Sequence, residues 1–134
     1  MVMPIPRLAE DNVAFWTGGR EGHLNIMRCE DCGWRWHPPS PRCPSCFGEQ
    51  VGAEAVSGQG HIYSFTINRR AWEPDLEVPY VIAIVELDEQ PGLRLLTNII
   101  DCAPDEVAIG RAVQASFIER GPVHLPVFRL VAND

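Results

Sequence analysis

The chain has 134 residues, enough for one ordinary domain, or for one small domain and a module that something other than a hydrophobic core holds together. Hydrophobic residues make up 46% of it and charged residues 22%, a composition that excludes a disordered chain. No apolar run approaches the ~18 residues of a membrane-spanning helix. The first residues also lack the basic start and apolar stretch of a signal peptide. We therefore expect a cytoplasmic protein without a membrane span.

The net charge is −7, and all 11 basic residues are arginine. Residues 51–134 carry twelve acidic side chains against six arginines, so they lack the concentrated positive field on which binding to a phosphate backbone depends. In a chain that we expect to be cytoplasmic, the five cysteines favour metal binding or redox chemistry over structural disulfides.

Two regions differ in composition. Residues 1–50 hold four of the five cysteines, five of the eleven aromatic residues and six of the twelve prolines. Residues 51–134 read as short strands separated by glycine and proline. We therefore expect an N-terminal module over 1–50 and a second domain over 51–134.

The residue pattern of the N-terminal region predicts little regular structure. Apolar spacing predicts a short helix over 8–16, which Gly18 would end. Alternating apolar and polar residues over 23–28 predict a strand, with 34–36 as its hairpin partner.

The second region predicts a small barrel of five or six short strands. In the strand 61–67, Tyr63, Phe65 and Ile67 are expected on one face. The strand 80–87 is almost continuously apolar, as in a strand buried on both faces. The expected strands are 51–56, 61–67, 80–87, 93–100, 112–118 and 127–131.

One motif has a specific chemical meaning. Cys29-Glu30-Asp31-Cys32 is followed, ten residues later, by Cys43-Pro44-Ser45-Cys46. Each pair can form a tight turn that points two thiolates at one ion, and two such turns give a tetrahedral four-sulfur site suited to Zn²⁺. Iron would fit the same spacing, and two disulfides or free thiols are the alternative to a metal. His37 could replace one cysteine, although four already suffice.

The expected zinc is structural, because four thiolates leave no open position for water or substrate. A ribbon of about 25 residues cannot bury enough surface to fold alone. Metal ligation worth roughly 10 kcal/mol supplies the missing free energy.

Motifs along the whole chain carry a resemblance to a known family. They are Phe15-Trp16 with Gly18 and Gly22, Leu24, Arg28-Cys29-Glu30-Asp31-Cys32-Gly33, Pro38-Pro39, Cys43-Pro44-Ser45-Cys46, Ser57-Gly58-Gln59-Gly60, Tyr63-Ser64-Phe65, Pro79-Tyr80-Val81, Glu86-Leu87-Asp88, Asn98-Ile99-Ile100 and Ile109-Gly110. The chain resembles the "domain of unknown function 35" proteins. Cys102 is not part of this pattern.

The resemblance implies a mainly β fold: a short N-terminal helical segment and a rubredoxin-like zinc ribbon, followed by a C-terminal five-stranded OB-fold barrel. It also implies an accessory subunit, which binds a thiolase-like enzyme of acyl-CoA metabolism, such as a steroid or lipid side-chain aldolase or an acyltransferase. Other family members accompany hydratase-like partners. Such a subunit helps to form or stabilise a CoA-thioester site and supplies no reacting groups.

The residues themselves offer no independent active site. The chain has no Gly-x-Ser-x-Gly elbow, phosphate loop or His-Glu-x-x-His motif. Cys102 could be a nucleophile, but a lone cysteine at a strand end is favoured as a small, partly buried apolar residue. Glu86, Asp88 and Glu89 are favoured as a solvated turn over an acid/base pair.

Aromatic residues and arginines are the candidates for binding. We expect Phe15 and Trp34 to pack internally, whereas Trp16, Trp36 and Trp72 are candidates for contacts with a protein partner or an acyl chain. A CoA site would bind phosphate through arginine, and the candidates near the expected ribbon–barrel junction are Arg20, Arg28, Arg35, Arg69 and Arg70.

Two alternatives to the accessory subunit remain at this point. Zinc ribbons and OB-folds also bind single-stranded nucleic acid, although the acidic balance of this chain opposes it. An independent enzyme, or an electron-transfer protein with iron in the ribbon, is the other alternative. The chain could assemble with itself or with another subunit.

Overall fold

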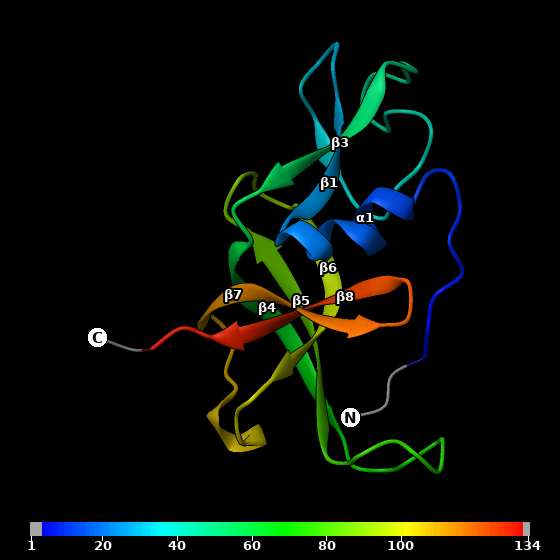
Figure 1. Ribbon diagram of the computed structural model, residues 1–134. Helices are drawn as coiled ribbons and strands as arrows, with labels where there is room; N and C mark the ends of the chain where they lie inside the picture. The colour runs from blue at the N-terminus through cyan, green and yellow to red at the C-terminus, as the bar shows by residue number, and fades with distance from the viewer. Residues whose placement is uncertain (1–3, 133–134) are drawn as a thin grey trace.

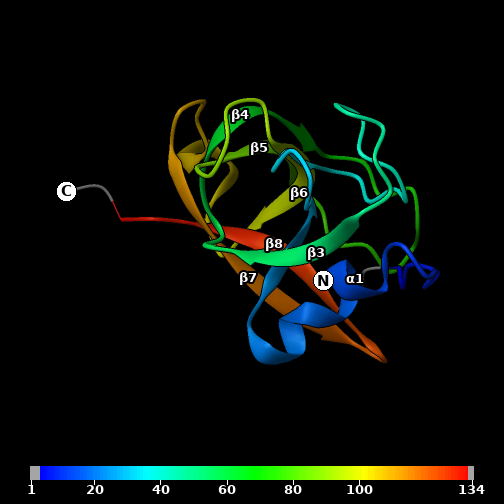
Figure 2. The same cartoon turned by 90° about the horizontal axis from the view of Figure 1, so that it is seen from above.

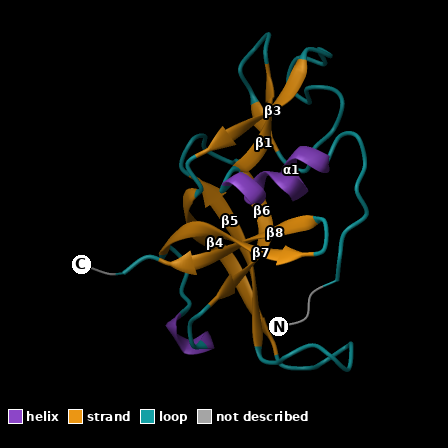
Figure 3. Ribbon diagram, in the orientation of Figure 1, coloured by secondary structure: helices purple, strands orange, loops and turns teal. Residues whose placement is uncertain are grey.

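The computed structural model describes residues 4–132 and is mostly β, with a small ribbon sheet standing on a closed barrel (Figures 1 and 3). The elements are α1 (Val13–Thr17), the 3-10 helix η1 (Gly18–Glu21), β1 (Leu24–Cys29), β2 (Arg35–Trp36), β3 (Val51–Val56), β4 (Gln59–Asn68), β5 (Tyr80–Leu87), β6 (Arg94–Ile100), the 3-10 helix η2 (Pro104–Glu106), β7 (Ala112–Arg120) and β8 (Val123–Leu130). No helix among the described residues is long and apolar enough to cross a bilayer.

The ribbon sheet has the strand order β2-β1-β3. β2 forms the predicted hairpin with β1, and β3 runs antiparallel along all of β1, from Leu24 opposite Val56 to Cys29 opposite Val51. β3 falls within the proposed second domain, 51–134, but its strand partner is β1 of the ribbon. Its middle residues, 53–55, are exposed, so β3 has no continuous apolar face with which to line a barrel. Figure 2 looks down on the barrel with β3 in front of it.

The barrel closes in the order β4-β5-β6-β8-β7, and β7 pairs back onto β4. All neighbouring pairs are antiparallel except β6 and β8, which run parallel at Ile99 and Phe128. This is the five-stranded barrel that the family resemblance implied, and β8 begins four residues earlier than the sequence pattern predicted. Fully buried Ile62, Val85, Val113 and Phe128 form the centre of its core.

Two details of the barrel differ from the predictions. A β-bulge between Ile62 and Ser64 shifts the register of β4, so Tyr63 does not share the inner face with Phe65. β5 is buried on one face only: its residues alternate strictly between buried and half-buried, and Ile82 and Ile84 lie on the outer side. The prediction that β5 is buried on both faces was wrong, because it rested on the apolar residues of this outer face.

The N-terminal helix begins later and continues further than predicted. It starts at Val13, and Gly18 does not end it, because η1 continues the turn to Glu21 and Gly22 stops it at φ 76°. Gly19 allows close packing on the barrel: a Cβ atom there would lie 2.5 Å from the Phe117 ring.

The two parts share one core. Phe15, Leu24 and Ile26 from the N-terminal region are buried in the same cluster as the barrel residues. A second, much smaller cluster in the ribbon consists of Met27, Cys29, Trp36 and Cys43. Only the outer part of the ribbon therefore depends on a source of stability other than the main core.

Candidate metal centre

The four predicted ligands come together at the outer end of the ribbon. Their Sγ atoms all lie within 4.8 Å of one another. The Cys29–Cys46 and Cys32–Cys43 Sγ separations are 3.6 Å and 3.7 Å. With Zn–S bonds of about 2.3 Å, the sulfurs of a tetrahedral site lie about 3.8 Å apart. The separations fit a tetrahedral zinc site, and they exceed the S–S bond of about 2.05 Å that a disulfide would require.

The two cysteine pairs have the same local geometry. The Gly33 N–H donates to the Cys29 carbonyl, and the Phe47 N–H donates to the Cys43 carbonyl, both at 2.9 Å. Both donors have positive φ, 78° and 63°. This fold turns backbone N–H groups toward the sulfurs, as in the 3.4 Å contact from the Ser45 N–H to the Sγ of Cys43.

The thiols also affect one another's ionisation. Burial acts to raise the pKa of Cys43, but N–H groups of Cys46 and Ser45 and the neighbouring thiols outweigh it and lower that pKa to about 7. At Cys46 the Gly48 N–H acts to lower the pKa, but the other thiols and burial raise it to about 12. Four thiolates crowded together repel one another, and a bound divalent cation removes that penalty.

His37 is not one of the four donors. Its ring packs on Phe15 with the ring centroids 4.6 Å apart, and burial lowers its pKa to about 4. The Cys₄ set is complete without it, so the site is closed and suited to a structural role.

The aromatic candidates are distributed differently from our expectations. Phe15 is buried as predicted, but Trp34, expected inside, is 42% exposed. Trp36 is buried in the ribbon cluster and donates from Nε1 to the Ser40 Oγ at 2.9 Å, so it is not available at the surface. Trp16 is half-buried against Phe15, and Trp72 is exposed with its Nε1 donating to the Tyr80 hydroxyl.

The five candidate arginines are not brought together. Arg28 and Arg35 both pair with Glu54 on β3, at 3.6 Å and 3.2 Å. Arg20 is exposed on η1. Arg69 and Arg70 follow β4 in an exposed loop at the barrel end away from the ribbon, not at the junction (Figure 1).

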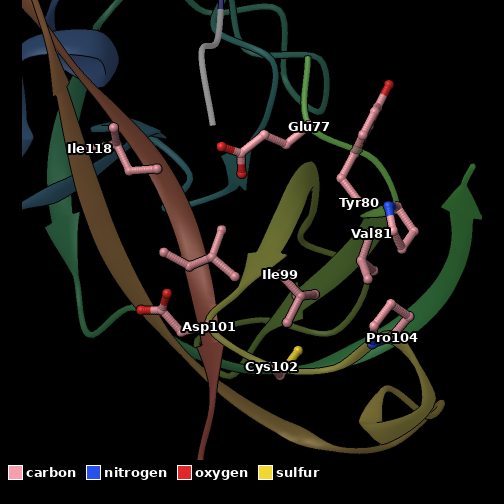
Figure 4. A pocket seen from close by; sticks show the side chains of 10 residues that line it. Glu77, Tyr80, Val81, Ile99, Asp101, Cys102, Pro104 and Ile118 are labelled. Carbon is pink, nitrogen blue, oxygen red and sulfur yellow. The ribbon is translucent and has the colours of Figure 1, made fainter. Parts of the chain in front are cut away.

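Cys102 lies at the same distal end, in the wall of a pocket of about 240 Å³. Figure 4 shows its side chain near Ile99 and Pro104. Burial and then the Glu106 carboxylate raise the pKa of Cys102, which keeps the thiol protonated, and none of the described residues that line the pocket is a histidine. This environment is that of a packing residue rather than of an activated nucleophile.

Two of the carboxylates considered as an acid/base pair, Glu86 and Glu89, accept hydrogen bonds from other groups. Glu86 accepts hydrogen bonds from the Arg94 Nε and the Gly92 N–H, which lower its pKa despite partial burial. Glu89 accepts from the Ser57 N–H at 2.7 Å. Sequence reasoning missed the role of Gln90, whose side chain binds both the N–H and the carbonyl of Arg35 on β2. No local pattern marks such a contact between residues 55 positions apart.

Comparison with known proteins agrees with this architecture. Residues 16–52 match the family model "ChsH2, rubredoxin-like zinc ribbon domain", and residues 53–117 match "ChsH2, C-terminal OB-fold domain". A DUF35 domain-containing scaffold protein of Methanocaldococcus jannaschii is 38% identical over 108 residues, which cover 78% of this chain and 75% of that protein. The chain belongs to the DUF35 family.

Other relatives of this DUF35 chain carry functional names. A solved structure titled "Ltp2-ChsH2(DUF35) aldolase" contains a chain with 38% identity and a TM-score of 0.83, over 96% of this chain and all of that one. A "benzoylsuccinyl-CoA thiolase subunit BbsA" of Thauera aromatica is 34% identical, over 60% of this chain and 54% of that one. A "probable enoyl-CoA hydratase alpha subunit" of Thermomonospora curvata is 38% identical over 94% of this chain, which spans only 39% of that longer relative.

Proposed function

We propose that this chain is a non-catalytic accessory subunit, which binds a thiolase-like enzyme of acyl-CoA metabolism and helps to form or stabilise the CoA-thioester site of that enzyme. The likeness to one chain of the Ltp2-ChsH2(DUF35) aldolase carries this proposal, because it extends over 96% of the chain at 38% identity. Two other relatives, a scaffold protein and a thiolase subunit, support the same role.

The chemistry of the described residues supports a partner that supplies the reacting groups. Four cysteines are committed to the metal site, and Cys102 is held as a neutral thiol. Glu86 and Glu89 are hydrogen-bonded within the barrel and its turn. The proposed zinc therefore holds the ribbon in shape, and the ribbon and barrel present a surface.

Contacts with the partner or an acyl chain are proposed for Trp16 and Trp72, which remain at least partly exposed. For CoA phosphates, the exposed Arg20, Arg69 and Arg70 remain candidates, whereas Arg28 and Arg35 would have to leave Glu54. We propose the cytoplasm as the location, in keeping with reduced, metal-bound thiols.

Co-expression tests the proposal. The genes adjacent to that of this chain would be searched for a thiolase-like protein, the two proteins produced together, and complex formation measured by analytical ultracentrifugation. We expect a stable complex of fixed stoichiometry, and acyl-CoA turnover above that of the thiolase-like protein alone. Two proteins that sediment separately, with unchanged turnover on mixing, would refute the accessory role.

The nucleic-acid alternative has a separate test. With a net charge of −7 the chain should not retain fluorescent oligothymidylate at low salt. Binding whose affinity falls steeply and linearly with the logarithm of salt concentration would favour the alternative.

A further inference from the structure

The bulge in β4 turns an aromatic side chain out of the barrel. Ile62 pairs with Val85 and Ser64 pairs with Ile84, so Tyr63 has no partner of its own in the ladder. Its side chain is 45% exposed. Bulges frequently re-aim a side chain next to a functional site, and here the result is a tyrosine ring on the outer surface.

Arg94 is held in place against that ring. Its guanidinium carbon lies 3.7 Å from the ring centroid of Tyr63, and its Nε donates to the Glu86 Oε1 at 3.0 Å. Glu86 is itself fixed by the Gly92 N–H at 3.2 Å. Within residues 4–132 no ion pair or hydrogen bond occupies the two terminal nitrogens of Arg94. The arginine is thus pre-organised, its side chain is 42% exposed, and its two terminal nitrogens have no partner among these residues.

Apolar side chains continue this surface along the barrel. The register places Glu86 opposite Arg94, Ile84 opposite Leu96, and Ile82 opposite Asn98. Leu96 is 70% exposed, and beside it lies a shallow hollow of about 160 Å³ between β4, β5 and β6. The surface therefore combines a tyrosine and a fixed arginine, two residue types enriched among those that dominate binding energy in protein interfaces, with the exposed aliphatic side chain of Leu96.

We propose that this outer face of β4, β5 and β6, centred on Tyr63, Arg94 and Leu96, is the docking surface for the thiolase-like subunit, and that the subunit presents a carboxylate to Arg94 between apolar side chains. The inference rests on the proposed function. Charge complementarity selects the carboxylate, because the terminal N–H groups of arginine match its two oxygens.

A second copy of this chain is a poorer occupant. In a symmetric contact the same patch meets itself. The carboxylate of this patch, Glu86, already contacts Arg94 and Gly92 through Oε1 and His61 through Oε2, all in its own chain. Such a contact would leave the terminal nitrogens of Arg94 buried without a partner, which is costly.

Matched substitutions test the surface in the co-expressed complex. Leu96→Ser and Arg94→Glu should each weaken binding about tenfold or more, as expected for residues near the centre of an interface. Ile5→Ser removes an apolar side chain, 50% exposed, which lies beside Gly121 at the β7–β8 turn, and Arg42→Glu reverses an exposed arginine on the ribbon. These two controls should bind within about threefold of wild type. Metal content and the urea midpoint of each free variant verify its folding.

Amide hydrogen exchange locates the contact without any substitution. Complex formation should protect residues 63–66, 82–86 and 94–98. The docking surface would be overturned if the Leu96 and Arg94 variants bound the partner as tightly as wild type, or if protection were confined to other segments. Either result would leave the accessory role intact. Failure of the wild type to bind would remove both. A dimer of the free chain that Leu96→Ser dissociates would assign the face to a second copy instead.

Discussion

Phe47 occupies a backbone conformation that favours glycine. Its φ is 63°, and the equivalent position after the first cysteine pair is Gly33 at 78°, with the same hydrogen bond to a cysteine carbonyl. The Phe47 side chain is 69% exposed, so little packing offsets the strain. At the residue scale, the tight turn that closes the second cysteine pair therefore determines the backbone conformation. A non-glycine residue there is strained.

Phe47→Gly should raise the free energy of unfolding by about 0.5–1 kcal/mol, because it relieves the left-handed strain. Urea denaturation of the zinc-loaded protein measures the change. Gly33→Ala is the converse substitution at the equivalent position and should lower the same free energy. A less stable Phe47→Gly protein would show that the phenyl ring packs on the ribbon after all.

His37 makes stability depend on pH. Burial lowers its pKa to about 4 from the ordinary 6.5, so the unfolded chain binds a proton more readily than the folded one. The stabilising contribution is complete above pH 6.5 and falls as the pH drops toward 4, by about 1.4 kcal/mol per pH unit within that window.

His37→Gln should flatten this part of the pH profile. Denaturation of both proteins between pH 7 and 4.5 isolates the effect, because metal loss at low pH is common to the two. Parallel profiles for variant and wild type would show that His37 does not titrate in this way.

The turn between β5 and β6 hydrogen-bonds to the β2 edge of the ribbon, in addition to the shared core. The Gln90 side chain accepts from the Arg35 N–H at 3.1 Å and donates to the Arg35 carbonyl at 2.8 Å, as a neighbouring strand would. Glu89 in the same turn binds the Ser57 N–H of the linker. At the element scale, this turn thus ties the β2 edge of the ribbon to the barrel.

Gln90→Ala should free the β2 edge and cost about 1–2 kcal/mol of local stability. The measurement is amide exchange, which should accelerate at residues 35–36 and stay unchanged in the barrel. Gln90→Glu keeps the acceptor and loses the donor, so its amide exchange rates at residues 35–36 should lie between those of wild type and Gln90→Ala. Gln50→Ala changes an exposed glutamine of the ribbon and serves as the control. Equal acceleration in Gln50→Ala would mean that the turn does not hold the ribbon.

The stability of the whole molecule is divided between a large core and a metal. The main cluster joins α1, the first half of β1 and the barrel, whereas the ribbon cluster has four buried residues, two of them cysteines. The sequence predicts an N-terminal module over residues 1–50 whose ribbon depends on a metal for its stability. Because Phe15, Leu24 and Ile26 are buried with the barrel, only the outer ribbon should require the ion.

Cys32→Ala, or removal of metal with a chelator, should release the ion and abolish amide protection over residues 29–50. Protection of the barrel core, including Ile62 and Phe128, and of α1 should persist. Metal analysis and hydrogen exchange together make the measurement. A variant that retains both metal and ribbon protection would contradict the Cys₄ assignment, and cooperative loss of the barrel would contradict the division of stability.

Much of this protein can be predicted from local sequence. The spacing of Cys29, Cys32, Cys43 and Cys46 suffices for the metal site, because each pair closes its own turn. Alternating apolar residues and turn glycines located most barrel strands within a few residues, since strand periodicity and turn conformation are short-range properties.

Tertiary structure decided the features that depend on distant partners. β3 belongs to the ribbon because β1 offers it a full ladder, and Arg28 and Arg35 are occupied because β3 brings Glu54 beside them. The bulge that exposes Tyr63 arises from the register of β4 against β5, which no window of sequence around Tyr63 specifies. Chain-wide pairing thus determines which side chains remain at the surface for a partner, while spacing along the chain alone determines where the metal binds.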